Sequence, residues 1–62
     1  MNKKYLLRGY LGRYQDYFND IETVDKLSQA EFMAKHHLKY FDKVVIFELP
    51  SMKKVKEVKI DG

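Results

Sequence analysis

The pattern of apolar and polar residues predicts four β-strands in the chain. Residues 4–10 are compatible with a strand, and residues 17–23 form a second extended segment in which acids interrupt the alternation. Residues 44–49 are β-branched and nearly all apolar, which predicts a central strand with both faces at least partly covered. After a turn at Pro50, residues 55–60 form a return strand whose outer lysines would protect a sheet edge.

One helix is predicted between the second and third strands. Residues 28–31 match the S-x-x-E capping box, in which the serine and glutamate side chains satisfy free backbone N–H groups. Apolar residues then recur at helical spacing, at Ala30, Met33, Ala34, His37, Leu38 and Phe41. We expect the helix to span 28–41 and the fold to be α+β. Its order is β-β-α-β-β, with one helix packed on one face of a mainly antiparallel sheet.

The length of 62 residues predicts a single domain, spanning 1–62. The chain has no cysteine, so disulfides and thiolate metal sites are excluded. No apolar run approaches the ~20 residues of a membrane helix, and only three apolar residues follow the basic pair at 3–4, so we expect no signal peptide. These features predict a cytoplasmic protein that needs no cofactor and has no membrane partner.

The net charge of +3 is distributed unevenly along the chain. Residues 1–14 contain four bases and no acid, whereas residues 16–25 contain four acids and no base. Bases dominate again in residues 35–43 and 53–59. Such segregation is the usual precondition for a surface with a one-sided electrostatic field.

Alternation divides the first strand into two faces. We assign one face to the core, and it carries Tyr5, Leu7 and Leu11. The other mixes positive charge with aromatic rings, and it carries Lys4, Leu6, Arg8, Tyr10 and, if the strand continues, Tyr14. Such a mixture suits single-stranded nucleic acid, because bases stack on aromatic rings and phosphates attract cations. The alternative is that Tyr10 and Tyr14 are cross-strand packing partners.

Residues 8–10, Arg-Gly-Tyr, resemble the first three positions of the RNA-recognition-motif signature. Leu11 and Gly12 depart from that signature, and the segment precedes the helix on an N-terminal strand. The match therefore agrees with RNA binding without assigning the chain to that family.

A second stripe on the predicted helix lies away from the core. It consists of Phe32, His36 and Tyr40. Lys35 and Lys39 flank it, so this stripe could contact RNA or a protein partner. The alternatives are that Phe32 and Tyr40 pack against the 14–27 segment, or that Phe32 is one of the singly exposed apolar residues that are common in proteins.

The residue types give no support for catalysis or metal binding. His36 and His37 are adjacent and point about 100° apart on a helix, so they do not form a ligand pair. Ser28 is assigned to the helix cap, and the acids of residues 16–25 lie in a polar stretch with nothing to raise a pKa. We therefore expect a binding protein that is not an enzyme, with no metal site.

The leading hypothesis is an RNA-binding protein that recognises single-stranded or structured RNA. The residues expected to bind are Lys4, Arg8, Tyr10, Arg13, Tyr14, Lys35 and Lys39. If the last strand lies nearby, Lys54, Lys56 and Lys59 would extend this surface. The alternative is a small regulator or inhibitor of a larger protein, in the style of phage and mobile-element proteins, acting through an edge strand or the Phe32 stripe. A third alternative is a homodimer whose aromatic face is its interface.

Overall fold

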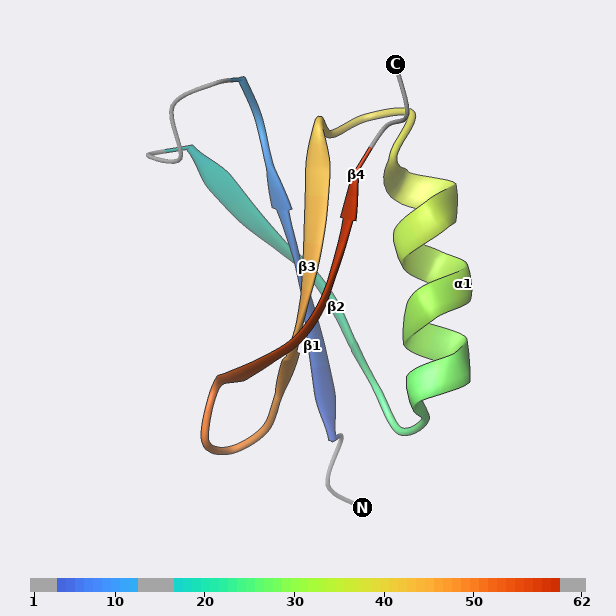
Figure 1. Cartoon of the computed structure of the whole chain (residues 1–62), viewed down its shortest axis with the longest axis vertical. Helices are drawn as coiled ribbons and strands as arrows, with labels where there is room; N and C mark the ends of the chain where they lie inside the picture. Colours follow the sequence, from blue (N-terminus) through green and yellow to red (C-terminus); the bar gives the residue numbers. More distant parts are fainter. Residues whose placement is uncertain (1–3, 13–16, 60–62) are drawn as a thin grey trace.

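A computed structural model describes residues 4–12 and 17–59, and it confirms the predicted α+β fold (Figure 1). The elements follow in the predicted order β-β-α-β-β. They are β1 (Tyr5–Tyr10), β2 (Phe18–Val24), α1 (Leu27–His37), β3 (Lys43–Glu48) and β4 (Lys53–Lys59). No helix in this part of the chain is long and apolar enough to cross a membrane.

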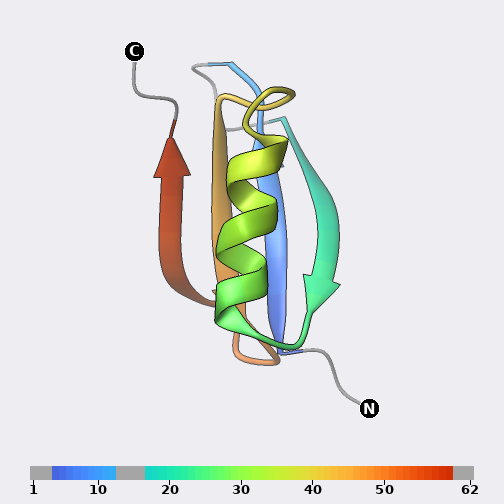
Figure 2. The same cartoon turned by 90° about the vertical axis from the view of Figure 1, so that its right-hand side faces the viewer.

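The four strands form one antiparallel sheet in the order β2-β1-β3-β4. The β3 strand is therefore internal, as its apolar run predicts, and Val44, Val45 and Ile46 are all buried. The β2 and β4 strands are the two edges. Helix α1 connects the two hairpins and lies across one face of the sheet (Figure 2).

The core lies between α1 and the sheet. It consists of Leu7, Val24, Ala30, Ala34, Val44 and Ile46. Tyr5 and Leu7 contribute to it as predicted, but Leu11 is exposed. The reason is that β1 ends at Tyr10 and the chain turns at Gly12, whose φ of +74° is a conformation that favours glycine.

The helix begins earlier than the capping box predicts. Lys26 is the N-cap and has no side-chain capping bond, and the backbone N–H of Ala30 already donates to the Lys26 carbonyl oxygen at 3.0 Å. Ser28 therefore lies within the first turn and cannot serve as the cap. The physical reason is burial, since Leu27 packs against the core and extends the helix by one residue.

The helix also ends earlier than predicted, at His37 instead of residue 41. The N–H groups of Tyr40 and Phe41 both donate to the His37 carbonyl oxygen, at 2.9 and 3.2 Å, which turns the chain away from the helix axis. This turn places the Phe41 ring directly over Gly9 of β1. The ring caps a strand position that has no side chain of its own.

Candidate nucleic-acid interface on the open sheet face

The face of the sheet opposite α1 is covered by no described helix or strand (Figure 1). Strand alternation and register bring side chains from all four strands together on it. We call them the open-face patch, which consists of Arg8, Tyr10, Phe18, Asp20, Lys43, Phe47, Lys54, Glu57 and Lys59. Leu6 and Val45 lie beneath these longer side chains and are buried.

Arg8 organises the β2 side of the patch. Its Nε atom donates to the Asp20 carboxylate at 2.7 Å, and its guanidinium carbon lies 4.3 Å from the centre of the Phe18 ring and 5.3 Å from that of Phe47. The hydrogen bond to Asp20 raises the pKa of Arg8 above its usual value. With only 21% of its side chain exposed, Arg8 links β2, β1 and β3 as a structural residue.

Two aromatic rings lie side by side at one end of the patch. Tyr10 and Phe18 are cross-strand partners, with ring centres 5.8 Å apart and ring planes inclined by 61°. The Nζ of Lys43 lies 4.9 Å from the centre of the Tyr10 ring. Phe18 is 47% exposed, so one aromatic surface beside two cations is open to a ligand.

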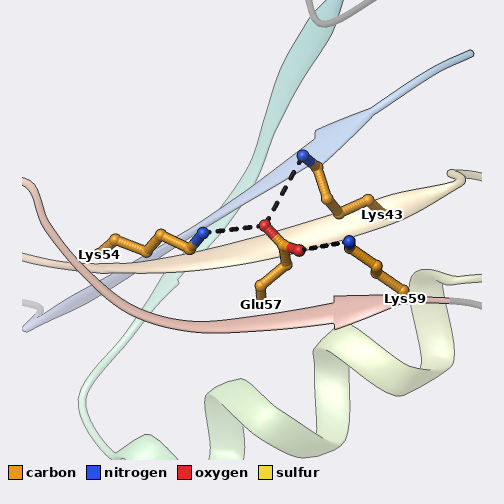
Figure 3. Close-up of polar contacts among 4 residues, drawn as sticks. All are labelled: Lys43, Lys54, Glu57 and Lys59. Carbon is orange, nitrogen blue, oxygen red and sulfur yellow. Dashed lines mark hydrogen bonds and ion pairs between the residues drawn. The ribbon is translucent and has the colours of Figure 1, made fainter. Parts of the chain in front are cut away.

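Three lysines surround Glu57 on the β3–β4 side (Figure 3). Oε1 of Glu57 lies 2.9 Å from Nζ of Lys54 and 3.7 Å from Nζ of Lys43, and Oε2 lies 3.0 Å from Nζ of Lys59. Hydrogen bonds from Lys54 and Lys59, followed by the charge of Lys43, lower the pKa of Glu57 from 4.5 to about 2. The glutamate is therefore charged at neutral pH, and the cluster keeps a positive excess.

A register shift makes this arrangement possible. Phe47 pairs with Lys54, whereas its neighbour Ile46 pairs with Lys56, so β4 has one extra residue at Val55. This bulge places Lys54 on the same face as Glu57. Lys56 instead lies on the helix side, where its Nζ is 2.6 Å from the Glu31 carboxylate.

The structure divides the seven residues predicted to bind nucleic acid. Arg8 and Tyr10 belong to the open-face patch, and alternation places Lys4 on the same face at the opposite end of β1. Lys35 lies in α1, so the sheet separates it from the patch, whereas Lys39 lies in the turn that leads from α1 to β3 and is not among the patch residues. Arg13 and Tyr14 lie outside the described residues.

The predicted helix stripe is exposed but does not form one continuous face. Phe32 and Tyr40 are 73% and 63% exposed, which contradicts the alternative that they pack against the preceding segment. His36 is also exposed. Because α1 ends at His37, Tyr40 follows in a turn, where its ring centre lies 6.2 Å from that of His37.

Sequence reasoning missed Phe18, Asp20, Lys43, Phe47 and Glu57 as members of the patch. Two signals could have found those on β2 and β3. Alternation within 43–48 puts Lys43 and Phe47 on one face, and antiparallel pairing of the first two strands brings residues near 18 opposite Tyr10. The position of Glu57 relative to Lys54 depends on the bulge, which has no sequence signal here.

Comparison of the chain with protein-family models, with curated proteins and with solved structures found no match to any of them.

Proposed function

We propose that this protein binds single-stranded RNA on its open sheet face and has no catalytic activity. The observation that supports this most directly is the contact of exposed Phe18 with half-buried Tyr10, beside a lysine-rich edge on a face that α1 leaves uncovered. Sheet-based RNA binders stack unpaired bases on aromatic residues in such a position. Cations alongside the rings then neutralise the phosphates.

The two parts of the patch have a separation suited to this task. Neighbouring strands lie about 4.8 Å apart, and Tyr10, Lys43 and Lys59 follow one another across β1, β3 and β4, so the backbones of Tyr10 and Lys59 are about 10 Å apart. A short single strand crossing from β2 to β4 would meet rings first and lysines afterwards. We assign base stacking to Phe18 and Tyr10, and phosphate contact to Lys54 and Lys59.

Arg8 has a different role in this proposal from the phosphate contact expected from its sequence alone. Its guanidinium is already held by Asp20 and two rings, so it supports the platform from below. Variants of Arg8 would therefore disturb the sheet surface as well as its charge. Cleaner tests use Phe18 and Lys59, which are exposed and peripheral.

The test is fluorescence anisotropy of labelled single-stranded RNA, with DNA of matched sequence, at about 50 and 200 mM salt. The two phosphate contacts assigned to Lys54 and Lys59 predict a loss of affinity of about sevenfold over this range. Phe18→Ala should weaken binding by about 1–3 kcal/mol, the value of one stacked base. Lys59→Ala should reduce the salt dependence by about one phosphate contact.

Lys35→Ala is the matched control, because it removes the same charge from the helix side. Its affinity should stay close to that of the wild type, and circular dichroism should show that all variants are folded. Absence of RNA binding at 50 mM salt, where charge attraction is strong, would refute the proposal.

A second candidate function is favoured by the 73% exposure of Phe32 on α1. An exposed phenylalanine on a helix is a typical anchor for a groove of a larger protein, as in a small regulator or inhibitor. This function predicts a partner whose binding tolerates salt and is lost in Phe32→Ala. Pull-down with the wild type and this variant, compared side by side, distinguishes it from RNA binding.

A further inference from the structure

Glu57 has an unusual position within the open-face patch. Lys43 and Lys59 are direct cross-strand partners, and like charges facing each other across two strands repel. Lys54, which precedes the bulge in β4, brings a third ammonium group to the same place, with its Nζ atom 2.9 Å from Oε1 of Glu57. The structure places one carboxylate among these three ammonium groups, so an anion is needed there for the local charges to be compatible.

We propose that the three lysines form a phosphate site and that Glu57 is an internal counter-ion which a backbone phosphate of RNA displaces. This inference rests on the proposed RNA binding and identifies where a phosphodiester would sit. The two carboxylate oxygens receive all three ammonium groups within 3.7 Å. The non-bridging oxygens of a phosphodiester offer the same charge and similar acceptors.

The exposure of the cluster allows such an exchange. The side chains of Lys54 and Lys59 are 56% and 66% exposed, so a phosphate can reach them from solvent. Ion pairs between exposed side chains are weak, because water screens them and holding long side chains costs entropy. Lys43 is less exposed and lies beside the Tyr10 ring, which connects the phosphate site to the stacking surface.

A second glutamate provides a matched control. Glu31 of α1 pairs with Lys56 of β4 at 2.6 Å, but this pair lies on the helix side of the sheet. Glu57→Gln and Glu31→Gln each remove one negative charge and keep the side-chain shape. They change the net charge equally and differ in the face on which the charge is lost.

The experiment measures RNA anisotropy for the wild type and both variants at about 50 mM salt. Glu57→Gln should bind about fivefold more tightly, as expected when a unit charge about 4 Å from the ligand is removed in water. Glu31→Gln should stay within about twofold of the wild type, since its charge lies on the other face of the sheet, where distance and salt weaken its effect on the phosphate site. Equal affinities of the two variants would overturn the inference while leaving RNA binding intact.

A second readout separates the phosphate site from RNA binding. Pyrophosphate is titrated into ¹⁵N-labelled wild type and Glu57→Gln, and amide shifts are followed by NMR. We expect changes concentrated at residues 43, 54, 57 and 59, with a lower dissociation constant in the variant. If pyrophosphate binds there but RNA does not bind, the site stands and the RNA proposal fails. Shifts spread evenly over all lysines would overturn the site.

Discussion

The close approach of Phe41 to Gly9 predicts that Gly9→Ala destabilises the fold. Gly9 is buried in β1, between Asn19 of β2 and Val44 of β3. A methyl group at this position would lie 2.5 Å from Cγ and Cδ1 of the Phe41 ring, and 2.7 Å from Cδ2. Ordinary carbon contacts are about 3.5–4.0 Å, so the ring must move by about 1 Å or more.

The expected destabilisation follows from two opposing contributions. Overpacking of this kind costs about 1–3 kcal/mol. Replacing glycine with alanine also restricts the unfolded chain, which offsets about 0.4–1 kcal/mol. The net loss should be about 1–2 kcal/mol, and in a domain this small each 1 kcal/mol lowers Tm by roughly 4–8 °C.

The assay is urea and thermal unfolding followed by circular dichroism, applied as a double-mutant cycle with Phe41→Ala. If the ring is the obstacle, Gly9→Ala should cost much less in the Phe41→Ala background, with a coupling of about 1–2 kcal/mol. A Gly9→Ala variant as stable as the wild type would refute the reasoning. So would additive effects of the two substitutions.

Two further predictions concern charge and core packing. The difference between a pKa of 4.5 and one of about 2 for Glu57 would correspond to about 3.4 kcal/mol unscreened, which solvent screening reduces to about 1 kcal/mol. Because the folded-state pKa is the lower one, this stability is present above pH 4.5 and is lost as the pH falls towards 2. The stability gap between wild type and Glu57→Gln in urea unfolding should therefore close over that interval, and a pH-independent gap would contradict the assignment. Leu7→Ala removes a fully buried core side chain and should lower the free energy of unfolding by about 2–5 kcal/mol. Circular dichroism should then show much of this small domain unfolded at 37 °C, and a variant that keeps the wild-type Tm would contradict the core assignment.

Much of the fold could be predicted because its signals are local. The apolar run at 44–49 predicted a central strand, and β3 is internal, with Val44 and Ile46 buried under α1 and Val45 buried beneath side chains of the open face. Alternation in β1 correctly separated Tyr5 and Leu7 from Arg8 and Tyr10. The helix boundaries were wrong because burial of Leu27 and the seating of Phe41 over Gly9 are tertiary effects.

The candidate site could be predicted only in part, because it is assembled from strands that are distant in sequence. The order β2-β1-β3-β4 brings Phe18 and Phe47 to either side of Arg8, which no single segment reveals. Lys35 looked equivalent to the sheet cations in sequence, but a helix that covers one face of a sheet carries its exposed charges away from the other face.

The bulge at Val55 has a consequence for how this surface could change by mutation. In a regular strand, only residues an even number of positions apart share a face. The extra residue lets Glu57 share its face with a lysine three positions before it and another two positions after it. The face on which each side chain before Val55 lies therefore depends on the number of residues in β4 as much as on their identity. The insertion of one residue between Val55 and Glu57 would turn one half of β4 over relative to the other, which would separate Lys54 from Glu57 and Lys59 without replacing a single charged residue.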